Sequence, residues 1–187
     1  MAFGLLSLKG RALRYLSQRE HSRVELQRKL APFAKRAVSQ VEDDAHAGAL
    51  QALNDMLDEL AHLGLLSDER TAASLLLHQN HRLGPRRLRQ QLVSKGLAPE
   101  LVSDTVAQAL ADELPRAHQL WQRRFGRLAV LGVDSARRSP AAERARQMRF
   151  LLGRGFSADV ANRVVREGGL RLADDVIDEQ AAEDGRP

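Results

Sequence analysis

The clearest chemical signal in this 187-residue sequence is a set of cationic side chains on two short segments with the same layout. A guanidinium group is a planar fork that can pair with a carboxylate or a phosphate through two parallel hydrogen bonds. The segments are "GPRRLRQQLVSKGL", with Arg86, Arg87, Arg89 and Lys95, and residues 142–154, with Arg144, Arg146, Arg149 and Arg154. This pattern predicts an anionic partner, either a protein or a nucleic acid.

The charge of the chain is unevenly distributed, although the net charge is only +5. Residues 1–81 hold ten basic and ten acidic residues, whereas residues 82–154 hold 15 basic and 6 acidic residues, a balance of +9. Arg82, Arg123 and Arg124 lie in this basic middle and complete the candidate partner-binding set. A merely solvated surface would explain any single arginine, but it does not require such a concentration.

Other chemistry is weakly supported. His78 and His81 have a spacing that can seat a metal, but no further ligand joins them, so we expect no metal site. His21 lies between Glu20 and Ser22, yet Ser22 is better explained as a helix cap than as a nucleophile. The sequence has no cysteine, no phosphate-binding glycine loop and no nucleophile elbow. We therefore expect no cofactor and no enzymatic activity.

The elements that carry the arginines belong to an internal repeat. Residues 89–106 align with 148–165 at a constant offset of 59, and in both copies a basic helix ends at a glycine, Gly96 or Gly155. Glycine adopts the left-handed backbone conformation that often ends a helix at the lowest steric cost. We expect both glycines to have positive φ, with Pro99 and Ser157 starting the helices that follow.

A fainter copy lies upstream, where Ser22 and Glu25 have the spacing of a capping box and Leu26 and Leu30 match Leu88 and Leu92. With the preceding helices near 9–19, 68–80 and 115–125, each unit comprises three helices. The predicted divisions are 9–66 with an insertion near 34–48, 67–111, 112–168 with an insertion near 126–139, and an acidic tail over 169–187.

The predicted fold class is all-α, because apolar residues recur with the period of a helix. The run "LAVLGV" (128–133) is the one place where a short strand would fit. Trp121 and Phe125 lie one helical turn apart, and we expect them in the core rather than on a base-stacking surface. No apolar run approaches the roughly 20 residues of a membrane span, and we expect a cytoplasmic monomer.

Several segments, in order along residues 9–168, resemble the RecX family of regulators of the RecA recombinase. "ALRYLSQREHSRVELQRKL" (12–30) resembles the opening block of that family, and "LGLLSDERTAA" (63–73) resembles its junction into the second repeat. The basic segments "GPRRLRQQLVSKGL" and "RQMRFLLGRGF" resemble the corresponding helices of its second and third repeats. The two insertions depart from the family pattern.

The resemblance implies an elongated, curved array of three tandem three-helix repeats without an active site. It also implies binding to the RecA filament on single-stranded DNA, with restraint of strand exchange, ATP hydrolysis and co-protease activity in recombination, DNA repair and the SOS response. Possible direct DNA contact is left open. The alternative function is an independent DNA-binding protein that places its basic helices in the major groove.

Overall fold

The computed structural model describes residues 7–36, 43–79, 81–126 and 139–168, without the side chains of residues 43–46. All regular secondary structure in these residues is helical, which confirms the all-α prediction. The apolar run at 128–133 and nearly all of the insertion predicted near 126–139 lie outside the described residues, as do residues 37–42 of the insertion predicted near 34–48. No helix in the described part is both long and apolar enough to cross a membrane.

The contacts among the helices divide the chain into two units. Unit 1 comprises residues 1–77 and 91–105, and unit 2 comprises residues 78–90 and 106–187. The division passes through α5 (Pro85–Ser94) and α6 (Pro99–Ala111), so helices of the predicted second repeat contribute to both units.

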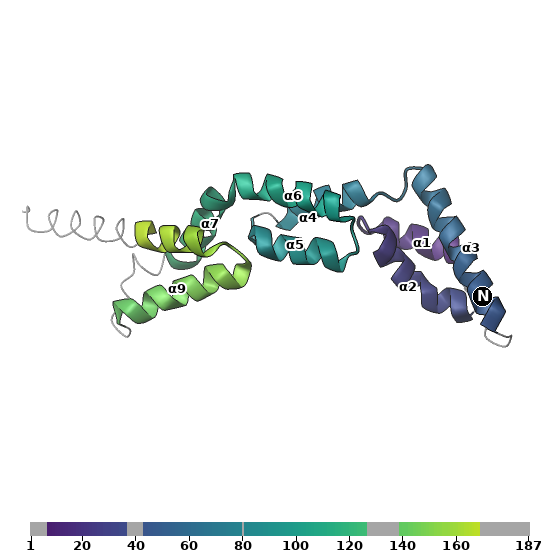
Figure 1. Ribbon diagram of the computed structural model, residues 1–187, viewed down its shortest axis with the longest axis horizontal. Helices are drawn as coiled ribbons and strands as arrows, with labels where there is room; N and C mark the ends of the chain where they lie inside the picture. Colours follow the sequence, from purple (N-terminus) through teal and green to yellow (C-terminus); the bar gives the residue numbers. More distant parts are fainter. Residues whose placement is uncertain (1–6, 37–42, 80, 127–138, 169–187) are drawn as a thin grey trace, which may run out of the picture. The chain divides into compact units, whose positions relative to one another are not determined.

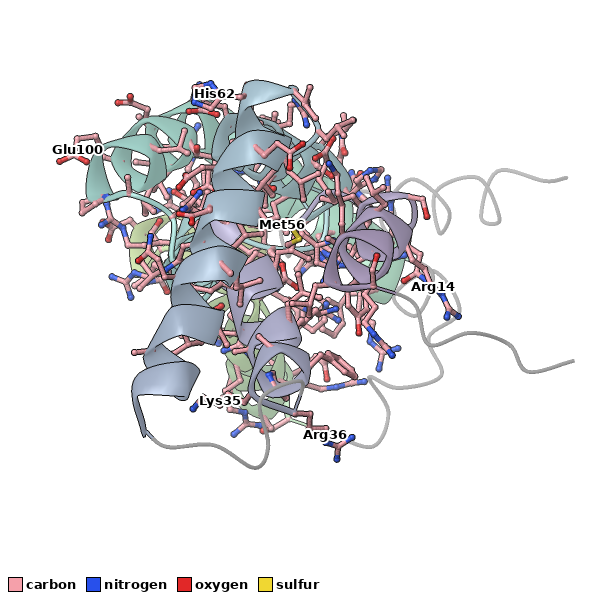
Figure 2. The ribbon with its side chains drawn as sticks, turned by 90° about the vertical axis from the view of Figure 1, so that its right-hand side faces the viewer. Arg14, Lys35, Arg36, Met56, His62 and Glu100 are labelled. Atoms are coloured by element: carbon pink, nitrogen blue, oxygen red, sulfur yellow. The ribbon has the colours of Figure 1, made fainter. Side chains whose placement is uncertain are left out.

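The core of unit 1 is formed by α1 (Leu8–Leu16), α2 (Arg23–Arg36) and α3 (Asp43–His62), which lie side by side in Figure 1. Leu26 and Leu30 on α2 and Leu53, Leu57 and Leu60 on α3 are fully buried, as the periodicity of their sequences predicts. Figure 2 shows Met56 pointing from α3 toward α1, where it packs against this core.

Two details of unit 1 differ from the simple helical pattern. On α1, Leu13 is 41% exposed, while the neighbouring and smaller Ala12 is fully buried. The α2 helix continues through Pro32 to Arg36, beyond the point where the sequence suggests an insertion. Between α3 and α4 (Asp68–Gln79), Gly64 has a φ of 69°, a helix-ending glycine that the repeat alignment did not reveal.

The core of unit 2 joins α7 (Glu113–Trp121), the π-helical turn η1 (Gln122–Gly126), α9 (Pro140–Arg154) and a helix over 158–168. Trp121 and Phe125 are each 3% exposed, which confirms that they belong to the core. The indole nitrogen Nε1 of Trp121 donates a 2.9 Å hydrogen bond to Oε1 of Gln147, so the polar edge of the ring is satisfied inside the core.

The predicted helix boundaries rest on local hydrogen bonds. The hydroxyl of Ser22 accepts from the backbone N–H of Glu25 at 3.1 Å, and that of Ser157 accepts from Val160 at 3.4 Å. Gly96 and Gly155 have φ values of 73° and 91°, which confirms that each basic helix ends in the left-handed conformation.

Candidate partner-binding surface

The arginines of α5 occupy its solvent-facing side. Arg86, Arg87 and Arg89 are exposed, whereas Leu88 and Leu92 are 2% and 0% exposed. A helix places residues three and four apart on one face, so Leu88 and Leu92 bury one side of α5 while the three arginines point away from it. Arg82, in the turn before α5, is also exposed.

The end of α9 lies beside the start of α5 in unit 2 (Figure 1). The backbone N–H of Gly84 donates to the carbonyl of Arg154 at 2.9 Å, and that of Arg86 donates to the carbonyl of Gly155 at 3.1 Å. These bonds satisfy groups that a helix start and a helix end otherwise leave open. They also bring the basic start of one repeat's helix next to the basic end of the next repeat's helix.

Further basic side chains gather around the end of α9. A shallow groove is lined by the side chains of Leu120, Arg123, Arg124, Phe150 and Arg154. The guanidinium of Arg154 lies 5.3 Å from the centre of the Phe150 ring, a cation–π arrangement that holds the charge at the rim. The groove therefore combines three cationic groups with two apolar surfaces.

The remaining candidates on α9 have different roles. Arg144 and Arg149 are exposed, but Arg146 pairs with Glu143 at 3.4 Å and lies 5.5 Å from the centre of the Phe125 ring. A partner would have to compete with these contacts to use Arg146. No ion pair joins Arg86, Arg89, Arg123, Arg124, Arg144, Arg149 or Arg154 to any other residue in the part of the chain that the structure describes.

Lys95 lies in unit 1 and is engaged there. Its ammonium Nζ donates to Oε2 of Glu25 at 2.6 Å, and its carbonyl accepts from the hydroxyl of Ser22 at 2.6 Å. Only 19% of its side chain is exposed. Of the eleven candidates, Lys95 is thus the one whose charge is neutralised by a carboxylate 70 positions away in the sequence.

Glu25 is the centre of this ion-pair cluster. Burial alone would raise the pKa of its carboxyl group, but hydrogen bonds from Arg19 and Lys95 outweigh burial and lower the pKa to about 2. The adjacent His21 is 1% exposed, and burial is the main cause that lowers the pKa of its ring. His21 is therefore a packed part of the turn between α1 and α2, as the sequence indicates.

Arg116 is a basic residue of the middle segment that serves the fold. It is 9% exposed, and its guanidinium donates to the carbonyls of Leu83 at 3.0 Å, Asp112 at 3.1 Å and Ala109. Burial is the main cause that lowers the pKa of its guanidinium. Nothing in the local sequence separates Arg116 from the exposed arginines, because one of its acceptors, the carbonyl of Leu83, lies 33 positions away in the sequence.

Two arginines missing from the candidate set, Arg163 and Arg166, line a second groove with Arg144. They lie on the helix over 158–168, in the part of the sequence whose overall charge is negative. A charge count over 155–187 hides them, whereas their spacing of three residues on one helix was a signal that could have found them.

His78 and His81 are both exposed, and no group of three or more metal-ligating side chains comes together in the described residues.

Comparison with known proteins gives the family. A family model described as RecX, third three-helix domain, matches residues 111–165. The regulatory protein RecX of Leptothrix cholodnii is 44% identical over 169 residues, which cover 90% of this chain and 90% of that protein. This chain belongs to the RecX family. The RecX protein of Ralstonia nicotianae is 41% identical, over 91% of this chain and 92% of that one.

Solved structures agree on the fold. The crystal structure of RecX from Lactobacillus salivarius has a TM-score of 0.61 and 20% sequence identity, covering 87% of this chain and 95% of that chain. A second crystal structure of a regulatory protein RecX has a TM-score of 0.60 and covers 84% of this chain. The all-helical repeat architecture inferred from the sequence is therefore the RecX fold, and this chain has the regulatory role for which the family is named.

Proposed function

We propose that this RecX protein binds the RecA recombinase assembled on single-stranded DNA and mainly inhibits its strand exchange, ATP hydrolysis and co-protease activity. It acts by binding as a cytoplasmic monomer, without a catalytic step. The proposal extends the family's regulatory name and the resemblance of the motifs to a specific partner.

The observation that supports the binding surface is the junction of α5 and α9. Backbone hydrogen bonds from Gly84 to Arg154 and from Arg86 to Gly155 join the start of α5 to the end of α9. Arg123 and Arg124 line a groove together with Arg154. We infer that cations from both helices act as one surface, here called the junction surface, consisting of Arg82, Arg86, Arg87, Arg89, Arg123, Arg124 and Arg154. Such a surface favours an anionic partner and speeds its association.

The test is the charge-reversed variant R86E/R87E/R89E. These side chains are exposed and the buried face of α5 is left unchanged, so the variant should fold. We expect its affinity for RecA filaments to fall about tenfold or more, because attraction is replaced by repulsion across the interface. Inhibition of RecA-catalysed ATP hydrolysis should fall in parallel.

A matched control is R14E/K35E/R36E in unit 1, which changes the net charge by the same amount. Figure 2 shows these three side chains pointing outward from α1 and the end of α2. This control should inhibit RecA as well as the parent. If both variants inhibit RecA equally, the junction surface is only a solvated face, and the proposal fails.

The alternative is direct binding to DNA, which the same exposed arginines would favour. Each phosphate that a protein neutralises adds about 0.7–0.9 to the slope of log affinity against log salt. A steep salt dependence for the chain with DNA alone, removed by R86E/R87E/R89E, would support that function instead. Salt-insensitive or absent binding to DNA alone leaves RecA as the partner.

A further inference from the structure

The second groove of unit 2 has a mixed cationic and apolar lining. It lies between α9 and the helix over 158–168, which run beside one another in Figure 1. The lining residues are Pro140, Arg144 and Met148 from the α9 side and Asp159, Asn162, Arg163, Val165 and Arg166 from the other helix. Pro140 and Met148 supply apolar surface beside three guanidinium groups.

The cations of this groove are only partly neutralised. Arg163 donates to Glu167 at 2.7 Å, but its side chain remains 58% exposed. Arg144 and Arg166 form no ion pair with another residue in the described ranges, and Asp159 is the only carboxylate in the lining. An occupant that fits this groove carries several negative charges next to a short apolar segment.

The chain itself contains a segment with that chemistry. The described structure ends at Gly168, two residues after Arg166. The sequence then reaches "DDVIDE" (174–179), where four carboxylates flank Val176 and Ile177. The six residues from Gly168 to Asp174 span at most roughly 20 Å when extended, so the segment is tethered within reach of the groove.

We propose that residues 174–179 of this chain dock into the groove between α9 and the helix over 158–168. Carboxylates pair with Arg144, Arg163 and Arg166, while Val176 and Ile177 pack on Pro140 and Met148. A short tether gives such a segment an effective concentration in the millimolar range, so a weak contact is sufficient to keep it docked. The next step rests on the proposed function: docking covers Arg144, one of the candidate partner-binding arginines, and therefore opposes binding of the RecA filament.

Docking is tested in the full chain by disulfide cross-linking, because the protein has no native cysteine. The variant N162C/V176C places one thiol in the groove and one in the acidic segment. The control Q90C/V176C places the first thiol on an exposed position of α5 that does not line the groove. With the oxidant diamide, we expect N162C/V176C to cross-link within the molecule at least about tenfold faster than the control.

The charge requirement is tested in the same background. Adding D174N/D175N/D178N/E179Q, or about 1 M salt, should bring the rate for N162C/V176C down to that of Q90C/V176C, because screening and neutralisation remove the ion pairs. Equal rates for the two cysteine pairs in the unneutralised protein would overturn the docking. A rate difference that survives neutralisation would overturn the electrostatic basis.

The regulatory effect is tested separately with RecA filaments. The cysteine-free variant D174N/D175N/D178N/E179Q should bind filaments about three- to tenfold tighter than the parent, since a docked competitor reduces the apparent affinity. The control E100Q/D104N/E183Q/D184N removes four charges but keeps "DDVIDE", and should differ from the parent by less than about twofold. Equal gains in both variants would show general charge repulsion and overturn the masking.

The two proposals fail in distinguishable ways. If no variant binds RecA, the proposed function is wrong, while the cross-linking rates still decide whether the acidic segment docks.

Discussion

Individual glycines and charged residues have roles that depend on what packs against them. The repeat alignment selected Gly96 and Gly155 as helix-ending residues, and both also approach a neighbouring helix. A Cβ atom added at Gly96 would lie 2.7 Å from side-chain atoms of Val24, and one added at Gly155 would lie 2.5 Å from the backbone nitrogen of Arg87. The two glycines therefore serve both the backbone conformation and the contact between repeats.

Replacing Gly155 with alanine should destabilise the protein by about 2–4 kcal/mol, through left-handed strain and a clash with backbone that cannot move aside. Gly96→Ala should cost about 1–2 kcal/mol, because the side chain of Val24 can shift. The free energy of unfolding is measured by urea denaturation. Gly126→Ala is the control, since nothing lies closer than 3.9 Å to its added Cβ. Equal effects at all three positions would contradict the packing role.

Gly84 extends this prediction to a residue with ordinary backbone conformation. An added Cβ would overlap the backbone of Gly155 and Phe156, which cannot retreat without breaking the hydrogen bond from Gly84 to Arg154. We expect Gly84→Ala to cost about 2 kcal/mol or more in the same denaturation experiment. A loss below about 0.5 kcal/mol would show that the α5–α9 junction has room to adjust.

Glu25 makes the stability depend on acidity. The pKa of its carboxyl group is lowered from the ordinary value of 4.5 to about 2 in the folded protein. The unfolded chain, in which the pKa is the ordinary one, therefore binds the proton more readily. The stabilisation is complete above pH 4.5 and is lost as the pH falls toward 2. We expect it to be about 2 kcal/mol, and Glu25→Gln should remove that part of the pH dependence in thermal melts. An unchanged slope between these pH values would contradict the ion-pair role.

At the scale of elements, Arg116 ties together the end of α6, the start of α7 and the turn before α5. Its three carbonyl acceptors come from Ala109, Asp112 and Leu83. Methionine has a similar length and apolar stem but donates no hydrogen bond. Arg116→Met should leave buried carbonyls without a partner and destabilise unit 2 by about 2–3 kcal/mol.

The control for this change is Arg149→Met, an exposed arginine on α9. Its effect on the free energy of unfolding should be within about 0.5 kcal/mol of zero. If Arg116→Met is equally mild, the carbonyls find water instead, and Arg116 is not a structural link.

For the whole molecule, unfolding of the two units can be followed with different spectroscopic probes. Trp121 is the sole tryptophan and lies in the core of unit 2, whereas circular dichroism reports the helices of both units. The ion pair between Lys95 and Glu25 lies in unit 1. In chains of repeats, each unit is stabilised by itself and by its immediate neighbours.

We therefore expect Glu25→Gln to shift the unfolding transition seen by circular dichroism at neutral pH by more than the transition seen by Trp121 fluorescence. Arg116→Met should do the reverse, because its contacts all lie in unit 2. Identical shifts with both probes for both variants would mean that the chain unfolds in one cooperative step.

Much of the fold follows from the sequence. The matched leucines of α2 and α5, which are buried, the capping serines Ser22 and Ser157 and the left-handed Gly96 and Gly155 follow the sequence pattern. The sequence does not reveal that Ala12 is buried while Leu13 is exposed, because alanine is the weaker hydrophobic signal. The π-helical turn at Gln122–Gly126 also has no signal in the sequence pattern that we recognise.

By itself the sequence determined the helices, the glycines that end them and the basic character of residues 82–154. Its motifs also gave the RecX resemblance. All of these depend on residues within a few positions of one another. Only the tertiary structure decided which cations remain available. It neutralised Lys95 with Glu25, buried Arg116 among three carbonyls, and placed Arg163 and Arg166 opposite Arg144. The physical reason is that ion pairing and desolvation depend on groups close in space, and the partner of Lys95 lies 70 positions away along the chain.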